Sequence, residues 1–242
     1  MCGRYNLGTS PDALQDLFGL DSIPAQIADS PPRYNIAPGQ PVLAVRQRAD
    51  GSRPAHLLHW GLIPSWAKDA SIGYKLINAR SETVADKPAF RSAFRQRRCL
   101  VPADGFFEWA ALPAVSAARP RKQPWHFQLQ PPRPFAIAAL WERWQDPQGQ
   151  SIDSCSLLTT RANAEVAAIH HRMPVILAAE SYAPWLEHGN RDLDSLQSLL
   201  RPLPDGQLSA YAVSSRVNSA ANDDPQCIAP LPQTPNPDEQ CR

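Results

Sequence analysis

The sequence lacks a hydrophobic run long enough to cross a membrane, a Cys-x-x-Cys pair and any large excess of one charge. Its apolar stretches all fall short of the ~18–20 residues that a membrane-spanning helix requires. The five cysteines are widely spaced, which argues against a structural zinc site. Because the formal net charge is only +1, a nucleic-acid partner would have to be held by a local basic patch.

We also expect no secretory signal, since polar residues follow Met1-Cys2-Gly3-Arg4 where an apolar segment would be needed. We therefore expect a soluble cytoplasmic protein that has no membrane partner and keeps its thiols reduced. What the sequence does have is 242 residues, 43% of them hydrophobic, and 26 prolines. This composition suits one large domain built from many short elements joined by fixed turns.

The pattern of apolar residues shows no internal repeat and no regular alternation of strands with helices. It predicts a mixed α+β domain of strongly bent, largely antiparallel, barrel-like sheets flanked by helices. An exposed loop is predicted over 111–124, and a polar strap from residue 218 leads to a flexible tail. Helices are predicted over 11–18, 87–98, 163–168, 182–188 and 193–200, and strands over 41–46, 54–60, 99–101, 105–109, 125–129, 134–141, 154–159, 175–177 and 208–214.

Cys2 carries the most distinctive chemistry in the chain. Its small side chain permits an aminopeptidase to remove Met1, which would leave an amine and a thiol on adjacent carbons. Such a 1,2-aminothiol condenses with an aldehyde to an imine, and the thiol then closes a thiazolidine ring. Intramolecular ring closure draws on effective molarities of roughly 10⁵–10⁸ M. Unperturbed, the amine titrates near ~7.7–8.0 and the thiol near ~8.5, so both are partly deprotonated at neutral pH.

Two polar motifs could serve such a nucleophile. Asn78 follows an apolar lead-in, and its amide offers a donor and an acceptor that could hold an N-terminal amine or thiol. Two residues later, Arg80 could grip a phosphate with two hydrogen bonds. Glu108 lies among aromatic residues and shares a strand face with Phe106, where burial would raise its pKa and suit it to accept a proton.

A histidine pair, a pair of tryptophans and a basic cluster each have two possible roles. His170 and His171 lie at a helix-to-strand junction and suit proton transfer, but adjacent side chains should diverge, so only one would reach a given pocket. The residues alone do not choose between them. Trp60 and Trp66 either stack on unpaired bases or fill the core. A basic cluster over 91–98 either follows a phosphate backbone or is a solvated helix face.

In combination, these motifs resemble the SOS-response-associated peptidase (SRAP) family, the abasic-site processing proteins. The resemblance runs from Cys2 to about Pro230, so we expect one SRAP domain over 2–230 and a flexible tail over 231–242. It is carried, in order, by Met-Cys-Gly-Arg-Tyr at the start, Tyr34-Asn35-Ile36-Ala37-Pro38-Gly39, Trp60-Gly61-Leu62-Ile63-Pro64, Asn78-Ala79-Arg80-Ser81-Glu82, Gly105-Phe106-Phe107-Glu108-Trp109 and His170-His171-Arg172-Met173-Pro174.

The resemblance implies that Cys2, once Met1 is gone, attacks the ring-opened aldehyde of an abasic site in single-stranded DNA. The product is a thiazolidine crosslink that shields the lesion during the DNA-damage response. Asn78 would position Cys2, Glu108 would contact its amine and handle protons, and His170 would assist sugar opening and crosslink reversal. The family thus selects His170 over its neighbour. No metal or organic cofactor is expected.

The same resemblance implies the contacts to DNA. Arg4 and Arg80 would hold phosphates that flank the lesion, while Pro38 and Trp66 would line the DNA channel or wedge against bases. Either Thr159 or Thr160 joins the site.

We expect a cytoplasmic monomer that associates with the nucleoid on damage. Two alternatives stay open. One is an N-terminal-nucleophile cysteine hydrolase that removes its own Met1. The other is a plain single-stranded DNA-binding module. An imine at the sugar would also permit lyase-like strand cleavage.

Overall fold

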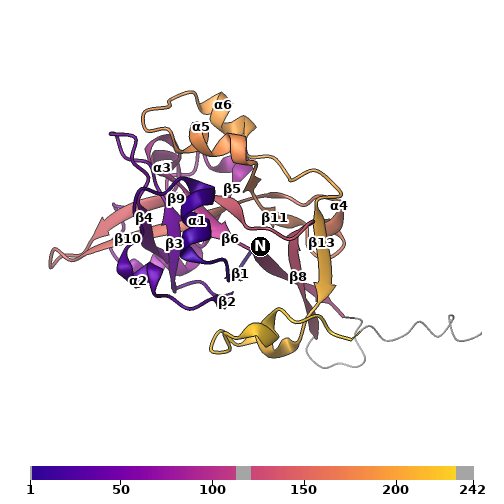
Figure 1. The fold of residues 1–242 in the computed structure, drawn as a ribbon. Helices are drawn as coiled ribbons and strands as arrows, with labels where there is room; N and C mark the ends of the chain where they lie inside the picture. The colour runs from indigo at the N-terminus through magenta and orange to yellow at the C-terminus, as the bar shows by residue number, and fades with distance from the viewer. Residues whose placement is uncertain (1, 113–120, 233–242) are drawn as a thin grey trace, which may run out of the picture.

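Five strands close into a barrel at the centre of the structure, a computed structural model that describes residues 2–112 and 121–232 (Figure 1). Around the ring the strands run β10-β4-β3-β6-β9, and pairing of β9 with β10 completes it. Within this ring only the β4–β10 pair is parallel. The barrel strands are β3 (Pro41–Val45), β4 (Ala55–Trp60), β6 (Arg98–Ala103), β9 (Phe135–Gln145) and β10 (Ser151–Arg161).

Three short strands extend the barrel at its edges. β5 (Asn78–Arg80) runs parallel to β10, β11 (Arg172–Pro174) runs antiparallel to the last residues of β10, and β12 (Ile176–Leu177) pairs with β9. β10 therefore contacts β5 and β11 near its end, which brings the Asn78 and Arg172 segments to the same edge of the barrel.

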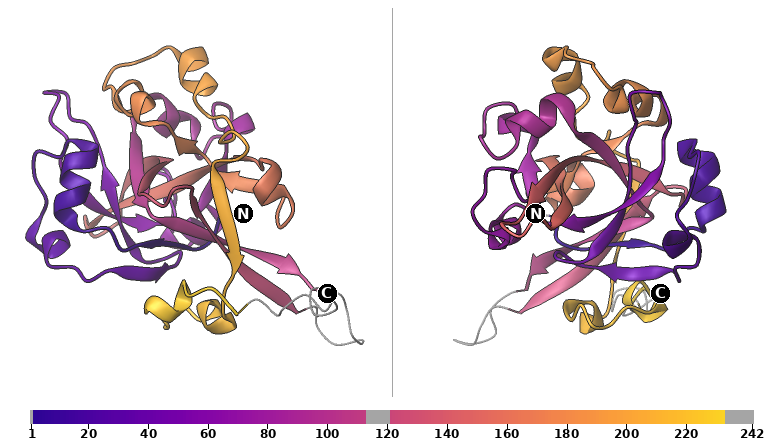
Figure 2. Two further views of the ribbon diagram at one scale, coloured as in Figure 1. Left: turned by 45° about the vertical axis from the view of Figure 1, so that its right-hand side comes forward. Right: turned by 90° about the vertical axis from the view of Figure 1, so that its left-hand side faces the viewer.

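A second sheet of five antiparallel strands packs against the barrel, in the order β13-β8-β7-β1-β2. In Figure 2 its β7–β8 hairpin projects away from the barrel with β13 along its side. The strands are β1 (Tyr5–Leu7), β2 (Arg33–Ile36), β7 (Gly105–Ala111), β8 (Lys122–Leu129) and β13 (Leu208–Ala212). The predicted α+β domain with largely antiparallel, barrel-like sheets is thus confirmed.

The helices are short, and most of them cover one side of the barrel. The first helix spans the predicted residues 11–18, with Ser10 as N-cap, Pro11 in its first turn and Gly19 in the left-handed conformation at its end. The α-helices are α1 (Pro11–Phe18), α2 (Ala25–Ala28), α3 (Arg91–Gln96), α4 (Ala164–Ala167), α5 (Tyr182–Leu186) and α6 (Leu193–Ser198). Short 3-10 helices are η1 (Ala70–Lys75), η2 (Ser81–Thr83), η3 (Ala179–Ser181), η4 (Ser215–Asn218) and η5 (Pro225–Cys227). Among the described residues, no helix combines the length and apolar character needed to cross a bilayer.

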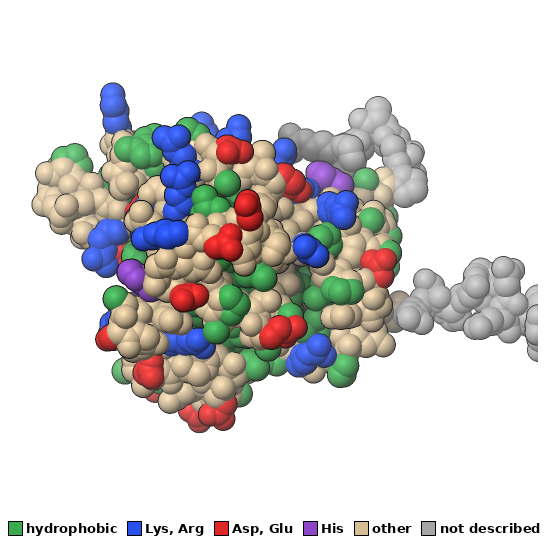
Figure 3. Space-filling view, turned by 90° about the horizontal axis from the view of Figure 1, so that it is seen from above, with side chains coloured by type: hydrophobic (Ala, Val, Ile, Leu, Met, Phe, Trp, Pro, Cys, Tyr) green, Lys and Arg blue, Asp and Glu red, His purple; other side chains and the backbone are tan. Residues whose placement is uncertain are grey.

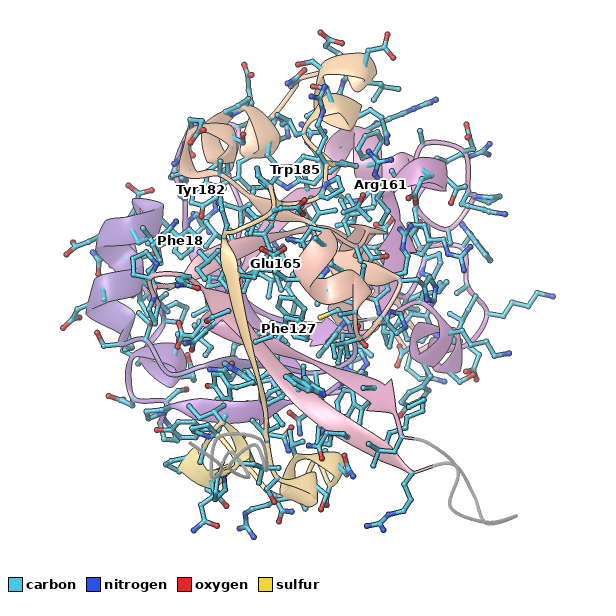
Figure 4. The ribbon with its side chains drawn as sticks, turned by 90° about the vertical axis from the view of Figure 1, so that its right-hand side faces the viewer. Phe18, Phe127, Arg161, Glu165, Tyr182 and Trp185 are labelled. Atoms are coloured by element: carbon cyan, nitrogen blue, oxygen red, sulfur yellow. The ribbon has the colours of Figure 1, made fainter. Side chains whose placement is uncertain are left out.

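The core is divided between two faces of the barrel. On the helix side, Phe18 of α1 stacks on Tyr182, with ring centroids 5.4 Å apart, and Trp185 of α5 is fully buried (Figure 4). On the other side, Cys2 and Phe106 lie in a second buried cluster between the barrel and the five-stranded sheet. Burying a large apolar side chain contributes about 1.5–3 kcal/mol, so the second cluster anchors the N-terminal segment strongly.

A predicted helix and a predicted loop differ in extent from the structure. The helix predicted over 87–98 covers only α3, because Arg98 already belongs to β6 and its buried guanidinium donates to the carbonyls of Phe94 and Trp185. The basic cluster is therefore not one solvated face, and Arg97 donates to Glu142 over 2.7 Å. The loop predicted over 111–124 is shorter, since β7 reaches Ala111 and β8 starts at Lys122. Its centre, 113–120, and most of the predicted tail, 233–242, lie outside the described residues.

Candidate functional site

The register of β1 against β7 places Cys2. Tyr5 pairs with Phe106, and the Phe107 N–H donates to the Arg4 carbonyl over 3.0 Å. Continued by two residues, this antiparallel alignment runs the N-terminal segment beside Glu108. Cys2 is fully buried at the end of that segment.

Asn78 holds Cys2 from the barrel side. Its Nδ2 donates to the Cys2 carbonyl over 2.8 Å, and pairing with Leu157 of β10 fixes its backbone. Trp60 adds to this support, because its indole N–H donates to the Ile77 carbonyl over 2.9 Å. The Oδ1 of Asn78 is buried without a hydrogen bond among the described residues, so the side chain that holds Cys2 also carries an unused acceptor.

Glu108 gives the site its electrostatic character. The side chain is only 3% exposed, and burial raises the pKa of its carboxyl to about 7. The predicted rise is thus confirmed in direction. Burial and, after it, the negative charge of Glu108 raise the pKa of the Cys2 thiol to about 12. At neutral pH the thiol is therefore protonated, while the Glu108 carboxyl is present in both its protonated and its ionised form.

His170 lies next to Glu108, with 3.9 Å between its Nδ1 and Oε1 of the carboxylate. Its Nδ1 lies against the Arg172 backbone, 3.0 Å from the N–H nitrogen and 3.2 Å from the carbonyl oxygen, so this backbone segment positions the ring. Burial lowers the pKa of His170 and favours its neutral form. The neighbouring rings do not diverge as predicted, because His170 stacks on exposed His171 with centroids 4.4 Å apart.

A salt bridge that the sequence did not reveal anchors the His170 loop. Arg172 donates to both carboxylate oxygens of Glu82, over 2.6 and 2.9 Å, and to the Thr159 carbonyl over 2.6 Å. Glu82 follows β5, and Arg172 is the first residue of β11, so the two partners are 90 residues apart in the sequence. Their pairing across the barrel edge fixes His170 relative to Asn78.

Arg4, predicted to hold a phosphate, has one nitrogen engaged inside the protein. Its Nη1 donates to Asn35 Oδ1 over 2.7 Å and to the Val217 carbonyl over 2.6 Å. Buried Asn35 also donates to the carbonyls of Ser219 and Asn222. The strap predicted from residue 218 thus lies against the segment that carries Cys2, a connection that no local pattern indicates.

The other predicted DNA contacts lie at the surface. Arg80 is exposed at the end of β5, two residues from Asn78, and Pro38 is half-buried in the turn after β2. Trp66 is 61% exposed, whereas Trp60 is fully buried and belongs to the core.

Both threonines at the end of β10 are buried. Thr159 Oγ1 lies 3.4 Å from Arg172 Nη2.

On the face shown in Figure 3, basic and acidic side chains are interspersed, so no field of one sign covers it.

The structure therefore brings together Cys2, Asn78, Glu108 and His170, the four residues predicted to be catalytic. The model of the SOS response associated peptidase (SRAP) family matches residues 1–220. The chain belongs to the SRAP family.

Its relatives include the abasic site processing protein YoqW of Bacillus subtilis, 42% identical over 94% of this chain and 99% of that protein. The abasic site processing protein HMCES of Gallus gallus is 30% identical over 96% of this chain and 78% of that protein. Among solved structures, an SRAP-like fold is present in a protein from Bacteroides thetaiotaomicron, with a TM-score of 0.84, 25% identity and coverage of 95% of this chain and 100% of that one.

Proposed function

We propose that this SRAP protein, once Met1 has been removed, forms a thiazolidine crosslink between Cys2 and abasic sites in single-stranded DNA. The observation that carries the proposal is the burial of Cys2 between Asn78 and Glu108, with His170 beside the carboxylate. The names of its relatives, abasic site processing proteins, support the same substrate.

The bonds of the proposed reaction balance without a cofactor. The sugar ring opens to its aldehyde, and the Cys2 amine adds to C1′ to give a carbinolamine. Loss of one water leaves an imine, and the Cys2 sulfur then adds to the same carbon while the thiol proton passes to the imine nitrogen. The net change is aldehyde plus aminothiol to thiazolidine plus one water.

Two residues would carry the protons. The Cys2 amine must be unprotonated to attack, and Glu108, with a pKa of about 7, accepts its proton at neutral pH. His170, which burial keeps neutral, can donate its ring proton to the sugar oxygen as the sugar ring opens and take it back on reversal. Asn78 fixes the Cys2 carbonyl, and its free Oδ1 is an acceptor for the amine.

The protonated thiol favours this sequence over the hydrolase alternative. A cysteine hydrolase attacks with a thiolate, whereas the pKa of the Cys2 thiol is about 12. Ring closure tolerates a weak thiol because the imine holds the electrophilic carbon a few bonds away. Self-cleavage of Met1 remains the second candidate, since it would use the same cysteine.

The DNA contacts proposed for this chemistry are Arg4, Arg80, Pro38 and Trp66. Because Nη1 of Arg4 already bonds within the protein and its Nε is buried, a phosphate would bind Nη2. We assign the reaction to a monomer over 2–230 that joins the nucleoid on damage.

The test mixes purified protein with a single-stranded oligonucleotide bearing one abasic site and runs a denaturing gel. We expect a heat-stable adduct with the wild type and none with Cys2→Ala. Cys2→Ser separates the two candidates, because serine forms only a weak oxazolidine but can support acyl transfer. Cys227→Ser, at a buried thiol elsewhere, is the matched control and should crosslink normally. An adduct of normal yield with Cys2→Ala would refute the proposal.

A further inference from the structure

Two aromatic side chains are unusually exposed for their size. Of the large hydrophobic residues in the described ranges, Tyr74 at 72% and Trp66 at 61% are the most exposed. Both lie in the segment that joins β4 to β5, the strand that carries Asn78. A flat ring held in water on the segment that leads into a catalytic strand marks a contact surface.

The backbone under Tyr74 is rigid. Gly61 and Gly73 pack so closely that a Cβ on Gly61 would lie 2.8 Å from the Gly73 carbonyl oxygen. The Leu76 N–H donates to that same carbonyl over 2.9 Å, and Asp69 caps the start of η1 through the Ser71 N–H. The backbone that carries Tyr74 is therefore fixed in one conformation, and little backbone entropy would be lost when a ligand binds to its ring.

The position of Tyr74 connects it to the predicted DNA channel. Its ring lies 3.8 Å from where a Cβ of Gly39 would stand, directly after Pro38. Exposed Lys75 follows Tyr74 in sequence, and with exposed Lys68 it lines a cavity of about 250 Å³ beside Trp66. Asp69 also lines this cavity, but its carboxylate accepts a hydrogen bond from Ser71. Aromatic rings interleaved with cations are what a single-stranded nucleic acid requires.

We propose that Tyr74 is a stacking platform for an unpaired base of the DNA strand that carries the lesion, with Lys75 facing the adjacent phosphate. The proposal rests on the proposed function, since it supplies a further contact for the same strand. Tyr74 acts through binding alone and touches no reacting atom. A protein partner on this surface would compete with that assignment, and the experiment below separates the two.

The test measures binding of an undamaged, labelled oligothymidine by fluorescence anisotropy. Base–aromatic stacking predicts that Tyr74→Ala weakens binding by about 5- to 150-fold. Tyr74→Phe keeps the ring and should bind like the wild type. Leu57→Ala, at an exposed apolar residue of β4, is the matched control and should leave affinity unchanged. Binding of a blunt duplex should not respond to Tyr74→Ala, because paired bases are not available to the ring.

Crosslinking to an abasic oligonucleotide gives an independent readout. Tyr74→Ala should raise the half-saturating oligonucleotide concentration and leave the rate at saturation unchanged. Equal affinity of wild type and Tyr74→Ala for the undamaged strand would overturn the proposal and leave the surface to another partner. If Tyr74→Ala weakens binding but the wild type never crosslinks, the proposed function fails while the stacking role stands.

Discussion

Replacing Glu108 with glutamine should stabilise the protein at alkaline pH while it slows the proposed reaction. Burial raises the pKa of this carboxyl from 4.5 to about 7 in the folded state. The neutral form therefore favours folding. Its contribution is fully present below about pH 4.5 and is lost as the pH rises through about 7. Each unit by which the folded-state pKa exceeds the unfolded-state pKa is worth ~1.36 kcal/mol. The ionised carboxylate therefore lowers the free energy of unfolding by about 3 kcal/mol at pH 8.

Glutamine has nearly the same shape and never ionises, so this cost disappears in Glu108→Gln. Urea denaturation should show the variant gaining about 2–3 kcal/mol over the wild type between pH 5 and pH 8. Crosslinking at pH 7 should slow by about 10²-fold or more, because the proton acceptor is gone. Binding of the undamaged strand should be unchanged.

Glu82→Gln is the matched control with the opposite sign. The hydrogen bond from Arg172 lowers the pKa of Glu82, so its stabilising contribution is present at neutral pH and is lost as the pH falls. This variant should be less stable than the wild type at pH 7, by a modest amount because the carboxylate is half exposed. A stability difference between Glu108→Gln and wild type that does not change with pH, or crosslinking at the normal rate, would refute the reasoning.

Three further variants test other parts of the site. Asn78→Ala removes the hydrogen bond to the Cys2 carbonyl and should slow crosslinking about 10- to 100-fold in a gel time course, with normal binding of undamaged DNA; an unchanged rate would contradict the positioning role. Arg172→Lys loses the two-point contact with Glu82 and should slow crosslinking a few-fold, since the loop that carries His170 is less fixed. Full activity would show that the pair is dispensable. Gly105→Ala would place a Cβ 2.6 Å from the Phe127 carbonyl oxygen and should lower the free energy of unfolding by about 1–3 kcal/mol. The loss should be visible as a lower Tm, whereas an unchanged Tm would show that the strands can separate there.

Local sequence patterns predicted the elements whose signals are local. The helix predicted over 11–18 is one of them, because its N-cap Ser10, its first-turn Pro11 and the Gly19 that ends it lie within ten residues. Closure of the barrel was not predictable in this way. It depends on the parallel pairing of Ser154 and Cys155 with a strand almost a hundred residues earlier, and no nearby residue encodes that pairing.

The candidate site shows the same division. The chemistry of Cys2, and the rise in the pKa of Glu108, follow from residue types and strand alternation. The selection of His170 came from resemblance, and only the structure shows its contacts with the Arg172 backbone and its distance from Glu108. The link between Arg4 and the strap at Val217 spans most of the chain, so the sequence gives no sign that the predicted phosphate ligand also holds the fold together.

The most direct test of the central claim is the intact mass of the purified adduct with an abasic oligonucleotide, followed by peptide mapping. The proposal predicts a species that has lost Met1, weighs one water less than the sum of protein and DNA, forms without borohydride and maps to Cys2. An adduct that retains Met1, needs borohydride trapping to survive, or maps to a lysine would contradict it.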